Sequence, residues 1–156
     1  MMMKPEAALL ELTVINAEAQ QAESFAAAAK ALLDRGLPPE VVTRMQDLWD
    51  KTKVIGGEVV AVGKIIIKKI VDFFLANPGL AIGVAIGAAV SALVSASIPF
   101  IGALLAPLVG VLVALYGYNI QEGGRDSMLH STVKLAVEFF KLLVDIFKAV
   151  VNYIVA

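Results

Sequence analysis

The clearest pattern along this chain is one long run without an ionisable side chain. Between Asp72 and Glu122 the sequence holds no Asp, Glu, Lys, Arg or His, and most of its residues are apolar. The hydrocarbon core of a bilayer is about 30 Å thick, and a helix crosses it with roughly 20 apolar residues. Residues 77–121 are therefore predicted to form a transmembrane helical hairpin.

Pro99 divides this run into two parts. Proline lacks a backbone N–H and restricts the residue before it, so a turn is expected around it. The two spans are then predicted at about residues 79–97 and 101–119. Each span carries small residues four positions apart, which allow packed helices to approach closely in lipid. The predicted helix-packing residues are Gly79, Gly83, Gly87, Ser91 and Ser95 in the first span and Gly102, Ala106, Gly110 and Ala114 in the second.

The segment before the run, residues 1–76, shows a different periodicity. Its apolar residues alternate at spacings of four and three, the pattern of a coiled-coil seam. The pattern predicts two helices, at about residues 5–35 and 39–76, that pair as an antiparallel helical hairpin. Gly56 and Gly57 weaken the second helix and favour a bend there.

The segment after the run, residues 122–156, is predicted to form an amphipathic helix from Asp126 or Ser127 to about Val155. Its charged residues are spaced four, three, four and three, so they form one narrow stripe on an otherwise apolar helix. Such a helix either lies in a membrane interface or packs against other copies of the chain. The stripe, a candidate pore lumen or subunit interface, consists of Lys134, Glu138, Lys141, Asp145 and Lys148.

The composition and the positions of the charged residues predict a location for this all-α protein. The chain is 59% hydrophobic and 17% charged, with a mean hydropathy of +0.82. All 13 Lys and Arg residues lie outside the uncharged run, so the positive-inside tendency places both termini in the cytoplasm, with the bacterial inner membrane as the expected location. Lys64, Lys68 and Lys69 border the first span and are predicted to contact lipid headgroups.

The sequence contains no pattern typical of an enzyme. It has no cysteine, one histidine (His130), and no Gly-rich phosphate loop. Trp49 is interpreted as a packing residue. The net charge of −1 and the lack of a one-sided basic patch argue against nucleic acid as a partner. We therefore expect no catalytic residues, no metal, no cofactor and no small-molecule substrate.

Residues 71–87, VDFFLANPGLAIGVAIG, resemble the membrane end of ElaB/YqjD-type small bacterial inner-membrane proteins. In that family an amphipathic helix ends at Asn-Pro and a Gly-rich span follows, which implies a membrane protein. This chain departs from the family because a second span and another helix follow the first span. The layout, an uncharged hairpin between amphipathic helices, is also similar to α-helical pore-forming toxins and colicin pore domains, without a shared motif.

Three functions are consistent with these patterns. The first is a non-enzymatic, self-assembling membrane protein that scaffolds or shapes the bilayer, with lipid and other copies of the chain as partners. The second is an oligomeric pore-forming toxin, defence protein or channel, with Ser91 and Ser95 or the charged stripe at its lumen. The third is a soluble all-α assembly that buries the hairpin in its core, because helices that are apolar all round can be buried in protein as well as in lipid.

Overall fold

The computed structural model describes residues 4–21, 24–55, 57–116 and 127–154, and it confirms the all-α fold class. The described residues form seven helices and one short antiparallel strand pair. The helices are α1 (Pro5–Gln20), α2 (Phe25–Asp34), α3 (Pro39–Trp49), α4 (Val62–Ala76), α5 (Ile82–Ser95), α6 (Pro99–Tyr116) and α7 (Ser127–Ile154), and the strands are β1 (Lys53–Ile55) and β2 (Glu58–Val60).

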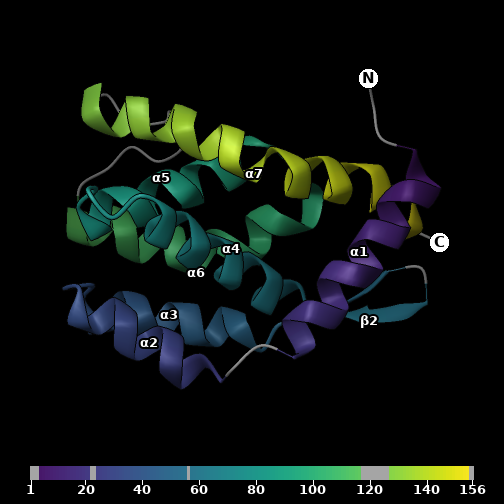
Figure 1. Cartoon of the computed structure of the whole chain (residues 1–156), viewed down its shortest axis with the longest axis horizontal. Coiled ribbons are helices and arrows are strands. Elements are labelled where there is room, and N and C mark those ends of the chain that lie inside the picture. Colours follow the sequence, from purple (N-terminus) through teal and green to yellow (C-terminus); the bar gives the residue numbers. More distant parts are fainter. Residues whose placement is uncertain (1–3, 22–23, 56, 117–126, 155–156) are drawn as a thin grey trace.

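The helices are stacked in layers. In Figure 1, α7 lies along the top of the molecule, α2 and α3 lie along the bottom, and α4, α5 and α6 lie between them. α1 crosses one end of the stack, where it packs against α7 and α4. The strand pair lies at the same end and contacts α7 through β1.

α5 is the centre of the hydrophobic core. Every residue from Ala85 to Leu93 is buried, and α5 packs against α4, α6 and α7. An α-helix is buried on all sides only when it carries no charge around its circumference. The uncharged sequence of α5 satisfies that condition, and here protein side chains surround it.

The predicted transmembrane hairpin is wrong. Among the residues that the structure describes, none of the helices has the length and apolarity needed to cross a membrane. α5 has 14 residues, roughly 21 Å at the helical rise, and α6 has 18 residues, roughly 27 Å. Both fall short of the hydrocarbon core of about 30 Å. The first helix begins three residues later than the predicted span because residues 77–81, including Pro78, are not helical.

Two further predictions depended on these spans and are corrected with them. A location in the bacterial inner membrane with both termini in the cytoplasm was derived from the positions of the charges around the spans. The pore-forming role needed the same spans to surround a lumen. The structure contains no membrane-spanning helix in its described residues, so both predictions are wrong.

The helix predicted over residues 5–35 is divided in two. α1 ends at Gln20 and α2 begins at Phe25, with Ser24 extended before it (ψ 156°). The two helices have different neighbours, because α1 packs on α7 and α4 whereas α2 packs on α3. The seam periodicity in the sequence continues across this break, so periodicity alone does not reveal it.

The helix predicted over residues 39–76 is also divided, by the strand pair. Lys53 pairs with Val60 and Ile55 pairs with Glu58, so the chain reverses direction between them. Gly57, in that turn, has a φ of +82°, which L-residues adopt only at a cost. The bend predicted near Gly56 and Gly57 is therefore a complete reversal of the chain.

Asn16 connects α1 to the strand pair by two side-chain hydrogen bonds. Its Nδ2 donates a hydrogen bond to the Val59 carbonyl oxygen (3.1 Å), and its Oδ1 accepts one from the Ala61 backbone N–H (2.8 Å). One amide side chain thereby satisfies a donor and an acceptor of the backbone that leads into α4. No sequence periodicity indicated this contact, because the partners are 43 and 45 residues away.

Replacing Asn16 with alanine is expected to lower the free energy of unfolding by about 2 kcal/mol, because two backbone groups lose their partner. Thr13→Ala is the matched control, since Thr13 Oγ1 is exposed and donates only to the Leu9 carbonyl oxygen of its own helix (2.9 Å). Its effect is expected to stay within about 0.5 kcal/mol. Urea unfolding followed by circular dichroism measures both. Equal losses in the two variants would contradict the bridging role of Asn16.

Candidate functional site

The predicted helix-packing residues of the first span lie in two environments. Gly83, Gly87 and Ser91 are buried in α5, whereas Gly79 and Ser95 are exposed. Ser95 Oγ donates a hydrogen bond to the Ala92 carbonyl oxygen of its own helix (3.1 Å). Neither serine lines a lumen in this structure, because Ser91 is buried in the core and Ser95 donates its hydrogen bond to its own helix.

The predicted helix-packing residues of the second span lie on the outside of the molecule. α6 uses one side to pack on α3 and α5, and its small residues lie on the other side, where all four are exposed. A side-chain carbon added at Gly102 or Gly110 would meet no atom within 4 Å. We call this side the α6 outer face; it consists of the exposed residues Gly102, Ala103, Ala106, Pro107, Gly110, Val113 and Ala114.

The three lysines predicted to contact lipid headgroups lie on α4. Lys64 is half-buried, and its Nζ lies 5.8 Å from the centre of the Trp49 ring. Lys68 is exposed and Lys69 is half-buried. The headgroup role was derived from the transmembrane spans and loses its basis with them. Trp49 also packs against Phe25, with ring centres 5.5 Å apart, in agreement with its interpretation as a packing residue.

The charged stripe of the last helix lies on the surface of α7. Lys134, Glu138, Lys141 and Lys148 are exposed and Asp145 is half-buried. Lys141 Nζ lies 3.1 Å from Asp145 Oδ2, one turn away on the same helix. These residues therefore form one charged stripe on the solvent side of α7.

Apolar side chains are exposed beside this stripe. Leu135, Phe139 and Leu142 are 47%, 39% and 56% exposed, and they follow each other at spacings of four and three on one side of the stripe. We call these three residues the α7 seam. Val137, also 47% exposed, lies on the opposite side of the stripe.

Two of the grooves on the described surface have mainly apolar walls. One, of about 390 Å³, lies between α5 and α7 and is lined by Ala92, Ala96, Val144 and the charged stripe from Glu138 to Lys148, among others. The other, of about 260 Å³, lies between α2 and α4, with Trp49 and Lys68 in its wall. Both have mainly apolar walls with charged groups at the rim.

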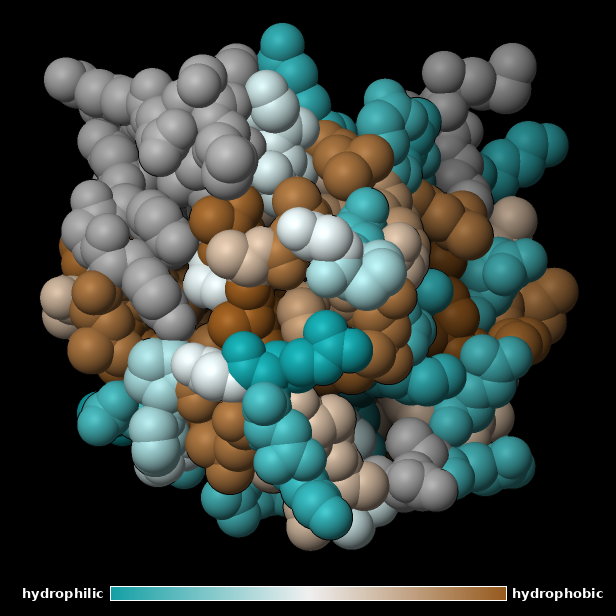
Figure 2. Space-filling model, turned by 60° about the vertical axis from the view of Figure 1, so that its left-hand side comes forward, coloured by the Kyte–Doolittle hydropathy of each residue, from teal (hydrophilic) through white to brown (hydrophobic). Residues whose placement is uncertain are grey.

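Exposed hydrophobic residues are spread widely over the described surface. Figure 2 shows one face, where hydrophobic residues (brown) are exposed between hydrophilic ones (teal). Val54 and Val59 form a directly opposed cross-strand pair and are both more than half exposed. Single exposed apolar residues are normal in folded proteins, so we give weight only to those that form a continuous surface, on α6 and α7.

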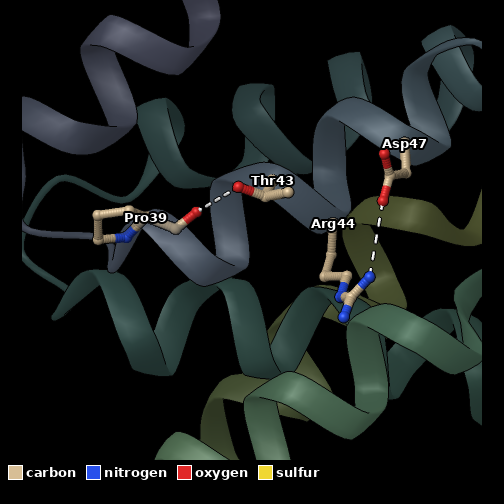
Figure 3. A network of polar contacts seen from close by, with 4 residues as sticks. All are labelled: Pro39, Thr43, Arg44 and Asp47. Carbon is tan, nitrogen blue, oxygen red and sulfur yellow. Dashed lines mark hydrogen bonds and ion pairs between the residues drawn. The ribbon is translucent and has the colours of Figure 1, made fainter.

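The polar contacts of α3 are local to that helix. Thr43 Oγ1 donates a hydrogen bond to the Pro39 carbonyl oxygen (3.0 Å), and Arg44 Nη1 lies 3.7 Å from Asp47 Oδ2 (Figure 3). Such exposed contacts contribute little to stability. Within the described ranges, no cluster of His, Asp and Glu is arranged to hold a metal ion. The side chain of His130 lies outside the described residues.

Comparison of the chain with protein-family models, with curated proteins and with solved structures finds no match. The resemblance to ElaB/YqjD-type proteins and the similarity of layout to pore-forming toxins stay predictions from the sequence. The two surfaces with a continuous character, the α6 outer face and the α7 seam, are the features from which a function can be argued.

Proposed function

We propose that this chain is a structural subunit that assembles with other copies of itself through the α6 outer face. One observation carries the proposal: the seven exposed residues of that face include no charged side chain and no side chain that can form a hydrogen bond. Continuous apolar surface on a folded protein marks an interaction site. Covering it with protein would contribute about 25 cal/mol for each Å² of apolar area removed from water.

The shape of the α6 outer face favours another helix as its partner. Gly102, Ala106, Gly110 and Ala114 follow each other at four-residue intervals and form an exposed row with no side chain longer than a methyl group. Helices pack most often by setting such four-residue rows into each other at about −50°. Two copies of α6 carry the same row, so they can meet around a two-fold axis with the same residues on both sides.

Ala106→Glu tests this proposal. The substitution places a charge in the middle of the α6 outer face, where burial without a partner costs several kcal/mol. We expect the dissociation constant of the assembly to rise at least about 100-fold. Sedimentation velocity at several protein concentrations measures the change as a loss of at least half the mass of the particle.

Ala17→Glu is the matched control, because Ala17 is exposed on α1, away from this face. It adds the same charge by the same substitution and should leave the mass unchanged. The proposal is overturned if the Ala106→Glu variant sediments like the unmodified chain, or if the unmodified chain is a monomer at the highest concentration.

A further inference from the structure

The α7 seam has the residue spacing of one half of a helix–helix interface. Leu135, Phe139 and Leu142 recur at the four and three spacing of a coiled-coil seam, yet they remain 47%, 39% and 56% exposed. On one side of the seam lies the charged stripe. On its other side lie buried residues that belong to the core, Ala136, Phe140 and Leu143.

The neighbouring helices leave the seam open along the first half of α7. α7 is the outermost helix of the stack, and α1 crosses it near one end (Figure 1). Further along the same side of α7, Ile146 and Ala149 are 0% and 6% exposed. The apolar side of α7 is thus covered beyond the seam and only partly covered at the seam, where Phe139 packs against Phe73 of α4 with ring centres 5.3 Å apart but stays 39% exposed.

We infer that α7 packs antiparallel against α7 of a second copy, around a two-fold axis that passes close to Phe139. The inference rests on the self-association proposed above and adds a second interface to it. In the antiparallel register that sets Phe139 opposite Phe139 of the second copy, Leu135 lies opposite Leu142 to within one residue. All three seam residues are then buried against seam residues.

The charges decide the direction of the pairing. In the same register Lys134 comes opposite Asp145 of the second copy, and Glu138 comes opposite Lys141, again to within one residue. Complementary charges that flank an apolar seam set the orientation of paired helices. In a parallel pair the two-fold axis runs along the helices and places the two stripes on opposite faces of the pair, so these cross-pairs do not form. Because Lys141 already contacts Asp145 within the helix, the cross-pairs would extend an existing ion pair into a network.

The two interfaces together predict an assembly larger than a dimer. Each is isologous, with the same surface on both copies, and it closes on itself around its own two-fold axis. A chain with two different surfaces of this kind binds two neighbours, one through the α6 outer face and one through the α7 seam. Repetition gives a closed tetramer or an open polymer.

Charge reversal tests the α7 pairing in the Ala106→Glu background, where the α6 contact is removed. Lys134→Glu and Asp145→Lys each create two repulsive contacts across the two-fold axis. We expect either substitution alone to raise the dissociation constant of the remaining dimer about 10-fold, and the two together to restore it to within about 3-fold. A combined variant that is as weak as the single ones would overturn the proposed register.

Cross-linking provides a second measurement. The chain has no cysteine, so the Phe139→Cys variant carries a single thiol close to the proposed two-fold axis. Mild oxidation should give a covalent dimer, because that position comes close to its own copy. Val137→Cys is the control, since Val137 is exposed on the other side of the stripe, at 47% against 39% for Phe139. Equal dimer yields from both variants, or none from Phe139→Cys, would overturn the inference.

Leu142→Glu and Ala106→Glu separate this inference from the proposed function. If both interfaces exist, each variant alone is a dimer and the double variant is a monomer. If only the α6 contact exists, Ala106→Glu alone gives a monomer and Leu142→Glu has no effect, which overturns the α7 inference. If only the α7 contact exists, Leu142→Glu alone gives a monomer and Ala106→Glu has no effect, which overturns the α6 proposal. If the unmodified chain is a monomer, both are overturned.

Discussion

Replacing Phe73 with alanine is expected to lower the free energy of unfolding by about 4 kcal/mol, because a large buried side chain leaves a cavity in the core. Phe73 is 0% exposed. Its ring centre lies 5.3 Å from that of Phe139 and 6.0 Å from that of Phe140. These contacts connect α4 to α7, so the substitution removes packing from two helices at once.

The loss is measurable as a fall in the melting temperature of roughly 12 °C for a chain of this size. Leu75→Ala is the control, since Leu75 lies on the same helix but is 56% exposed, and it should cost no more than about 0.5 kcal/mol. Both measurements need the same protein concentration, because self-association makes stability depend on concentration. Similar losses in the two variants would show that Phe73 is not a core residue.

Replacing Gly63 with alanine is expected to cost roughly 3 kcal/mol, through overpacking. Gly63 is buried in the first turn of α4, and its backbone N–H donates a hydrogen bond to the Lys51 carbonyl oxygen (3.0 Å). An added side-chain carbon would overlap the carbonyl oxygen of Leu48, near the end of α3. That oxygen belongs to the backbone and cannot rotate away. The cost outweighs the gain of about 1 kcal/mol that alanine brings to a helix.

Gly79→Ala is the matched control for Gly63. Gly79 lies between α4 and α5, and a side-chain carbon there meets no atom within 4 Å. Its stability is expected to change by no more than about 0.5 kcal/mol. Denaturant unfolding of the two variants compares them directly. If Gly63→Ala proves as stable as Gly79→Ala, the close approach of α3 and α4 at Gly63 is absent in solution.

Phe73 and Gly63 lie in the part of the core that supports both proposed interfaces. Phe73 packs against Phe139, which belongs to the α7 seam, and α3 forms much of the support beneath α6. Loss of the core is therefore expected to disturb assembly indirectly. The surface variants Ala106→Glu and Leu142→Glu avoid this complication, because both positions are exposed.

Helix content was predictable wherever a helix is amphipathic. α7 runs from Ser127 to Ile154, in agreement with the helix predicted from Asp126 or Ser127 to about Val155. The spacing of its charges also predicted one charged stripe along the helix, and these residues lie on the surface of α7, where Lys141 contacts Asp145. These features depend on the 3.6-residue period, which is local information.

The interruptions between helices were not predictable in the same way. The seam pattern continues through residues 21–24 and through the strand pair, because each side of these breaks still needs apolar residues on one face. Asn16 belongs to no sequence pattern that predicts a contact, yet it connects α1 to the backbone before α4. Its role comes from residues that only folding brings near.

By itself, the sequence determined that this protein is helical, that α5 needs an apolar surrounding on every side, and that the charged residues of α7 form one narrow stripe. Only the tertiary structure decided that α5 obtains its surrounding from α4, α6 and α7, and that the small residues of α6 lie outside. The physical reason is that apolar side chains gain about the same free energy by leaving water for lipid or for protein. Hydropathy therefore shows that a segment must be buried. Whether lipid or protein buries it depends on how helices that are distant in the sequence pack.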